Sequence, residues 1–178
     1  LGENHPDVAT SIDNLAGLYE AQGRYSEAEP IYKKALNLRN SALGEEHTDV
    51  AQSLSNLAGI YVLQANYDEA ERLYQESLRL RRKLLGEYHP VIAQNLSDFA
   101  RLYDAKGYFR KAESLFKEAL KVYKKLGVDH PNLAESLNNL ADLYRVKGRY
   151  EEAERLYEEA LQLRRRLLGE SHPDIAES

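Results

Sequence analysis

Five histidines recur along the chain at an almost constant spacing. They are His5, His47, His89, His130 and His172, and successive members lie 42, 42, 41 and 42 residues apart. Imidazoles among many glutamates could bind a metal ion or transfer protons. A metal site needs all of its ligands around one centre, whereas these histidines begin successive helical pairs and therefore lie one structural unit apart. We interpret them as helix-boundary residues and expect no metal site.

No other pattern indicates catalysis or a cofactor. The chain has no cysteine, which excludes disulfides, thiolate metal sites and cysteine nucleophiles. The motifs GxxxxGKS/T, HExxH, GxSxG and GxGxxG are absent from the sequence. Neighbouring glutamates such as Glu27 and Glu29 are explained by helix capping and the helix dipole. We expect a protein that is not an enzyme and that binds no cofactor.

The predicted helices recur along the sequence with the same spacing as the histidines. A period of 42 residues predicts a solenoid, in which each unit buries its apolar face against its neighbours. Within each period an amphipathic helical pattern, a short turn and a second helical pattern follow one another. No strand is predicted, so the fold class is all-α. The recurring aromatic positions, expected in the core, are Tyr19, Tyr61, Tyr103 and Tyr144; Tyr25, Tyr67, Phe109 and Tyr150; and Tyr32, Tyr74, Phe116 and Tyr157.

Local residues predict where the helices begin and end. The first helix is expected over residues 8–22, and Gly23 breaks its pattern. Ser26 and Glu29 have the spacing of a capping box, which predicts the start of the second helix. Gly44 is expected to end that helix as a left-handed cap.

The charge balance argues against nucleic acid or an anionic membrane as the main partner. The chain carries 24 Lys and Arg against 29 Asp and Glu, a formal net charge of −5, whereas both of those partners select basic surfaces. Basic clusters fall in the last turns of second helices, where cations complement the helix dipole. Contact with an anion is the alternative interpretation of these clusters, which are Arg81–Lys83, Lys124–Lys125 and Arg164–Arg166.

Localisation is predicted only from signals that the sequence lacks. Its longest apolar run, Leu57 to Leu63, is far shorter than the ~20 residues that cross a bilayer. No basic and then apolar leader opens the sequence, so we expect a cytoplasmic protein. Leu1 and Ser178 both fall inside repeat units, and we expect the array to continue beyond them.

The repeat resembles a known family. The run from Ile12 to Tyr19 (Ile12, Leu15, Ala16, Tyr19), followed by Tyr25, Ala28, Tyr32 and Ala35, resembles the tetratricopeptide repeat (TPR). The long period and the boundary phrase LGENHPDVA are similar to the kinesin light chain class of this repeat, although Thr48 replaces the boundary proline. The resemblance implies a right-handed α-solenoid of four repeats and a truncated fifth, at about 1–42, 43–84, 85–125, 126–167 and 168–178.

The resemblance also implies a binding groove lined by the first helix of each repeat. The residue before the recurring Leu-Ala or Phe-Ala pair is Asn14, Asn56, Asp98 or Asn139. An amide both donates and accepts, so such a row can hydrogen-bond the backbone of an extended peptide. A role in the helix–helix seam is the alternative. Gln52 and Gln94 are expected as secondary contacts, and Arg101 and Arg145, together with Asp98, as residues that select charge.

The assigned groove is acidic. Two arginines face six carboxylates there, which are Asp13, Glu20, Asp98, Asp104, Glu135 and Asp142. Kinesin light chains take acidic peptides in a basic groove, so this groove is expected to bind a neutral or basic segment of a protein partner. The rival prediction is an architectural role with end-to-end self-association. Tyr88, Tyr108 and Tyr123 lie outside the recurring aromatic positions and are expected to be freer to contact a partner.

Overall fold

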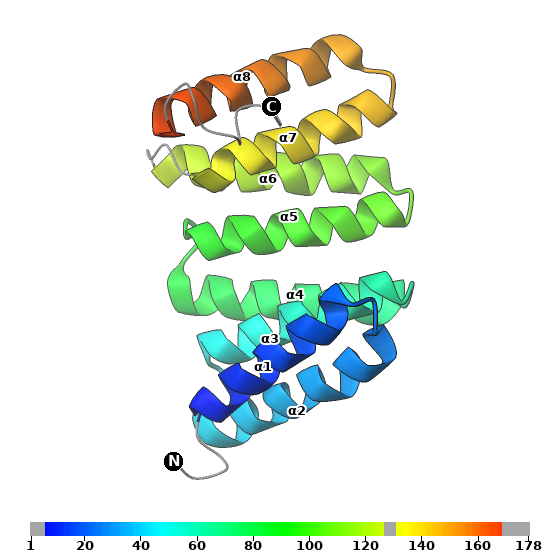
Figure 1. Ribbon diagram of the computed structural model, residues 1–178. Helices are drawn as coiled ribbons and strands as arrows, with labels where there is room; N and C mark the ends of the chain where they lie inside the picture. Colours follow the sequence, from blue (N-terminus) through cyan, green and yellow to red (C-terminus); the bar gives the residue numbers. More distant parts are fainter. Residues whose placement is uncertain (1–5, 127–130, 169–178) are drawn as a thin grey trace. The chain divides into compact units, whose positions relative to one another are not determined.

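The protein folds into helical hairpins. The structure, a computed structural model, describes residues 6–126 and 131–168, and within these ranges it contains eight helices and no strand (Figure 1). The chain divides into two compact units, Leu1–Gly86 and Glu87–Ser178. The helices are α1 Pro6–Ala21, α2 Tyr25–Leu43, α3 Thr48–Leu63, α4 Tyr67–Leu85, α5 Pro90–Ala105, α6 Phe109–Leu126, α7 Pro131–Val146 and α8 Tyr150–Leu168.

Each repeat contributes a first helix (α1, α3, α5 or α7) and a second helix (α2, α4, α6 or α8) that pack along each other. In the first unit α2 also packs on α3, and in the second unit α6 packs on α7. Each second helix in these pairs is therefore shared between two first helices, which is how a solenoid builds a continuous core. The predicted all-α solenoid is confirmed.

The turn between the two helices of a repeat is a backbone motif rather than a set of side-chain bonds. In the first repeat the N–H of Arg24 donates to the carbonyl of Tyr19 at 2.9 Å, and Gly23 has φ of 72°. This six-residue closure around a left-handed residue is the Schellman arrangement. Gly107 and Gly148 take the same place later in the chain, but Ala65 holds it in the second repeat with φ of 59°.

The capping box expected at the second helix is wrong. α2 begins at Tyr25, and its N-cap is Arg24, which makes no side-chain cap hydrogen bond. Ser26 therefore lies inside the first turn, because the Schellman closure ends at Arg24, two residues earlier, and makes that residue the N-cap. Glu29 instead accepts hydrogen bonds from α3. The left-handed cap expected at Gly44 is also wrong, because its φ of 80° is combined with ψ of 163°, an extended region open to glycine.

The recurring histidines cap the first helices. The Nδ1 atom of His47 accepts from the backbone N–H of Asp49 at 3.1 Å, and that of His89 accepts from Val91 at 3.3 Å. The predicted helix-boundary role is thus confirmed for these two residues. The other three members of the set, His5, His130 and His172, lie outside the described residues.

The core consists of alanines at the helix crossings and larger side chains between them. Ala16, Ala58, Ala100 and Ala141 have no exposed surface, and five of the ten recurring tyrosines are buried. The row at the start of the second helices is not part of the core as expected: Tyr25, Tyr67 and Phe109 are half-buried and Tyr150 is exposed. Tyr123, expected to be free for a partner, is completely buried instead. It follows Arg39 and Arg81 by the repeat step, and those two arginines are buried as well. This position of the second helix therefore points into the repeat junction.

Candidate functional site

The residues predicted to contact a ligand lie on the first helices at steps of three or four residues. We call the following set the first-helix stripe: Asn14 on α1; Gln52 and Asn56 on α3; Gln94, Asp98 and Arg101 on α5; and Glu135 and Asn139 on α7. Every member is exposed or half-buried, so the stripe is open to solvent. Helical periodicity places such residues on one face of each helix.

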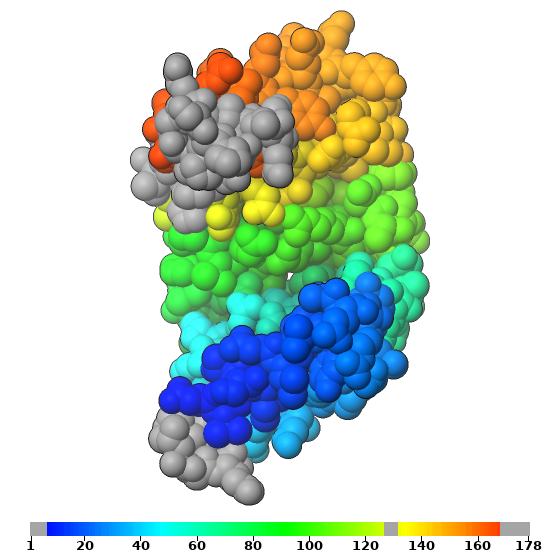
Figure 2. Space-filling model, in the orientation of Figure 1, coloured from blue at the N-terminus to red at the C-terminus, as the bar shows by residue number. Residues whose placement is uncertain are grey.

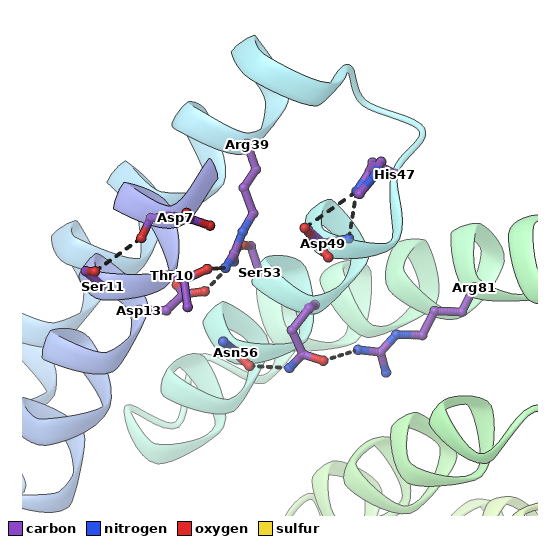
Figure 3. A network of polar contacts seen from close by, with 11 residues as sticks. Asp7, Thr10, Ser11, Asp13, Arg39, His47, Asp49, Ser53, Asn56 and Arg81 are labelled. Carbon is purple, nitrogen blue, oxygen red and sulfur yellow. Dashed lines mark hydrogen bonds and ion pairs between the residues drawn. The ribbon is translucent and has the colours of Figure 1, made fainter. Parts of the chain in front are cut away.

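In the first unit the stripe is linked to a buried arginine. Gln52 donates from Nε2 to Oδ1 of Asn56 at 2.7 Å, and its Oε1 accepts from Arg81 of α4 at 2.8 Å (Figure 3). The Gln52 amide is therefore oriented by its neighbours before any ligand arrives. Asn14 makes no hydrogen bond to the rest of the stripe within the described residues, so the structure does not bring it together with Asn56.

A second buried arginine removes Asp13 from the predicted groove. Figure 3 shows Arg39 reaching from α2 toward α1 and α3, where it donates to Asp13, to Ser53 and, at 3.4 Å, to Thr10. The Asp13 side chain is only 10% exposed. Burial raises the pKa of Asp13, while the hydrogen bond and the charge of Arg39 act in the opposite direction. Asp13 thus belongs to the repeat junction rather than to the acidic face that the sequence predicted.

In the second unit the stripe forms one connected cluster. Arg101 donates to Asp98 at 3.1 Å, to Glu135 of α7 at 2.9 Å and to Oδ1 of Asn139 at 3.5 Å. Gln94 donates to the same Asp98 oxygen at 3.2 Å. The predicted contacts of α5 and α7 are thereby brought together across two repeats. The charge of Arg101 is already shared between two carboxylates.

Asn139 and Arg145 differ from the prediction in detail. The Nδ2 atom of Asn139 is buried and has no hydrogen-bond partner within the described part of the chain. Such a donor lowers stability until an acceptor reaches it. Arg145 does not join the cluster, because it pairs with Asp142 at 3.1 Å, and Tyr157 of α8 donates to that same carboxylate at 2.8 Å. It lies where α7 meets α8.

The helical hairpins, their 42-residue step and the polar stripe on the first helices agree with one family. Tetratricopeptide repeat models match residues 8–49, 49–125 and 133–174. The chain belongs to the tetratricopeptide repeat family. A search of curated protein sequences found no match to it.

Solved structures place this TPR array in the kinesin light chain-like class. BtubC, also called BKLC, from P. vanneervenii is 27% identical over 95% of this chain and 68% of its own, with a TM-score of 0.79. A Podosopora anserina protein named for kinesin light chain and for nearly identical TPR-like repeats is 26% identical over 97% of this chain and 82% of its own, with a TM-score of 0.80. A single-substitution variant of that protein gives the same values.

The TPR array shows no sign of two other kinds of site in its described residues. No helix there is both long and apolar enough to traverse a bilayer. Nor do those residues gather three or more His, Cys, Asp or Glu side chains where a metal ion could sit.

A set of residues at the repeat junctions was missed by the sequence analysis. In the first unit Glu29 of α2 accepts from Lys33 at 2.7 Å, from Tyr61 of α3 and from Gln64, the C-cap of α3. The hydrogen bond from Lys33, followed by that from Gln64, lowers the pKa of Glu29. The Lys33 ammonium also lies 5.7 Å from the centre of the Tyr61 ring.

The same junction recurs in the second unit of the TPR array. Glu113 of α6 accepts from Lys117 at 2.7 Å, from Tyr144 at 2.8 Å and from Arg149 at 3.1 Å. Burial by itself raises the pKa of Glu113, but these three hydrogen bonds outweigh it and the pKa is lowered. The repeat step was the available signal, because it carries Glu29 to Glu113 and Tyr61 to Tyr144. The amphipathic pattern alone could not find them, since a glutamate near a helix start is also explained by the dipole.

Proposed function

We propose that this TPR array binds an extended segment of a partner protein along the first-helix stripe. TPR repeats are generally protein–protein interaction modules, and solenoids offer extended surfaces that suit extended ligands. The observation that carries the proposal is the connected polar cluster of α5 and α7, in which Gln94, Asp98, Arg101 and Asn139 lie side by side and open to solvent.

The chemistry of the stripe favours the backbone of the ligand. Gln52, Asn56, Gln94 and Asn139 carry amides, which pair with peptide N–H and C=O groups without selecting a side chain. Gln52 donates to Asn56, whereas Gln94 donates to Asp98 and Asn139 accepts from Arg101, and these side chains are all exposed or half-buried. A ligand can therefore replace them at little net cost, since one hydrogen bond is exchanged for another.

The charges of the stripe favour a neutral or basic segment. In the second unit Asp98 and Glu135 both face the single guanidinium of Arg101. A basic ligand finds carboxylates that are incompletely neutralised, whereas an acidic ligand must displace them from Arg101. Because Asp13 is buried against Arg39, the groove is less acidic than the sequence predicted. The remaining carboxylates still favour a neutral or basic segment.

A peptide array tests the proposal. Extended peptides in neutral, basic and acidic versions are compared for binding to the chain and to the double variant Asn56→Ala, Asn139→Ala. Asn37→Ala is the matched control, because Asn37 is exposed on α2, away from the stripe. We expect neutral or basic peptides to bind and the double variant to lose binding while the control retains it. Preferential binding of acidic aromatic peptides, or equal binding by the double variant, would overturn the proposal.

A second candidate function is an architectural one, in which chains associate end to end. Leu15 and Leu18 of α1 are 45% and 55% exposed, whereas their counterparts Leu57 and Ile60 on α3 are buried. α1 lies at the surface of the first unit on the face that Figure 2 shows. Exposed apolar surface of this kind marks an interaction site.

The last helix offers the complement for a second copy. Glu154 of α8 holds the repeat position of Glu29 and Glu113, which accept from Tyr61 and Tyr144 of the following first helix. On α1 the corresponding tyrosine is Tyr19. α8 of one copy can therefore cover α1 of another as α2 covers α3.

Light scattering as a function of concentration tests this second candidate. We expect Leu15→Glu with Leu18→Glu to abolish association, and Leu63→Glu, another exposed leucine, to leave it unchanged. A chain that stays monomeric at every concentration would exclude it.

A further inference from the structure

A cleft on the second-helix side of the first unit is not used by the proposed function. It has a volume of about 350 Å³ and lies between α2 and α4, with residues of α3 at its base. The apolar lining includes Leu36 of α2, Leu54 of α3 and Leu73 of α4, and charged side chains that include Lys33 and Glu76 also line it. The volume is at the lower end of the range for ligand sites in proteins.

The cleft contains a polar atom without a partner. Asn40 of α2 lines it, and its Oδ1 is buried with no hydrogen-bond partner in the described residues. A buried acceptor in this state destabilises the protein until a donor reaches it. Nearby on the lining, Glu76 of α4 has Arg72 at 3.7 Å, a long contact for an ion pair, and its side chain is 43% exposed. The lining therefore offers two acceptors that are incompletely satisfied.

The second unit contains the same lining with one decisive difference. Two repeat steps carry the leucines of the first-unit cleft to Leu120, Leu137 and Leu156, and carry Glu76 to Glu159. The same steps carry Asn40 to Lys124, whose ammonium pairs with Glu159 at 3.0 Å and so joins α6 to α8. In the second unit this position is thus completed by an aliphatic stem that ends in an ammonium group, and in the intervening repeat it is held by Arg82, also a cation on an aliphatic stem.

We propose that the cleft of the first unit binds a lysine side chain from a partner protein. The methylene stem packs on the leucines that line the cleft, because a lysine stem readily covers apolar surface while its head stays polar. The ammonium donates to Oδ1 of Asn40 and pairs with Glu76, as Lys124 pairs with Glu159. Asn40 carries no positive charge to pair with Glu76, which leaves the place for an external lysine. This site does not depend on the first-helix stripe, because the two share no residue; on α3 the cleft is lined by residues such as Leu54, whereas the stripe contains Gln52 and Asn56.

Nuclear magnetic resonance titration with Nα-acetyl-lysine N-methylamide tests the proposal. We expect shift changes at the residues of the cleft, including the side-chain amide of Asn40. The norleucine analogue has a similar stem without the ammonium, and the arginine analogue has a larger, planar head. Both are expected to bind at least about tenfold more weakly. Equal binding by the norleucine analogue, or no shift at the cleft at the highest soluble concentration of the lysine amide, would overturn the proposal.

Two variants follow from the repeat comparison. Asn40→Lys installs the residue of the second unit, and we expect it to fill the cleft and remove lysine binding. Asn37→Lys, an exposed substitution on the same helix with the same charge, is the matched control and retains binding. Lys124→Asn is expected to open the corresponding cleft and give a second set of shifts on α6 and α8. If Asn40→Lys binds lysine as the control does, or if Lys124→Asn gains no site, the assignment is wrong.

Discussion

Arg39 of α2 donates to the carboxylate of Asp13 on α1 in the interior of the first unit, where the two side chains are 7% and 10% exposed. The same guanidinium donates to Ser53 of α3, so a single side chain connects three helices and two repeats. The relationship explains why an arginine occupies a core position that is otherwise suited to a tyrosine, Tyr123, two repeats later.

We expect this pair to be strongly coupled. Arg39→Leu leaves the Asp13 carboxylate buried without its partner, and such a break costs about 3–5 kcal/mol. The double variant Arg39→Leu, Asp13→Leu removes both charges and is expected to be more stable than the single one. Urea unfolding of the wild type, both single variants and the double variant gives the coupling free energy. A double variant whose loss equals the sum of the two single losses would show that the residues act independently.

The Schellman turns predict a stabilising substitution. Ala65 adopts a left-handed backbone at the place where Gly23, Gly107 and Gly148 stand in the other repeats. A residue with a Cβ atom loses roughly 1–2 kcal/mol there, partly offset because glycine loses more freedom on folding. We expect Ala65→Gly to raise the free energy of unfolding by about 0.5–1 kcal/mol, as measured by urea unfolding. Gly107→Ala is the reverse control and should lower it, since space is open around Gly107 and only the backbone conformation is at stake.

The glutamates at the repeat junctions predict how the free energy of unfolding changes at acid pH. Glu29 and Glu113 have pKa values below their ordinary 4.5. A carboxylate of this kind stabilises the fold fully above its unfolded pKa, and the contribution is lost as the pH falls through the lower pKa of the folded state. Asp13 has the opposite sign, because its raised pKa means that the folded state takes up the proton first.

We therefore expect the wild type to lose the stability supplied by Glu29 and Glu113 as the pH falls below about 4.5. The double variant Glu29→Gln, Glu113→Gln should start less stable at neutral pH and depend less on pH in the acid range. Thermal unfolding at a series of pH values measures both effects. Glu158→Gln, an exposed substitution on α8, is the control. Parallel pH curves for the wild type and the double variant would contradict the prediction.

The fold could be predicted from the sequence because its period leaves little choice. A step of 42 residues with helical apolar spacing fixes the order of the helices, and recurring residues such as Ala16 mark where they cross. Helix starts were less predictable. Ser26 has the residue type of a cap, but the preceding Schellman turn places the cap of α2 two residues earlier, at Arg24. Local propensity cannot show which of two overlapping signals prevails.

The site was predictable only in part, because hydrogen-bond partners from other helices do not show in a local pattern. The stripe positions on α5 and α7 follow from helical spacing. Asp13, however, looks like any exposed acid until Arg39 of the next helix is placed against it. Arg81, expected in a solvated basic cluster, is buried and bonded to Gln52 for the same reason. The local sequence therefore does not show which residues a long side chain will contact.

Gly59 of α3, three residues after the stripe residue Asn56, allows binding to be separated from folding. Gly59 lies mid-helix, where glycine is about 1 kcal/mol less favourable than alanine. A Cβ atom added there would lie 3.8 Å from the Tyr74 hydroxyl, which is ordinary contact. We expect Gly59→Ala to raise the free energy of unfolding by about 1 kcal/mol in urea unfolding. If the peptides selected by the array pass close to α3, the added methyl group should also weaken their binding. Stabilisation with unchanged peptide affinity would place the ligand away from this part of the stripe, on α5 and α7.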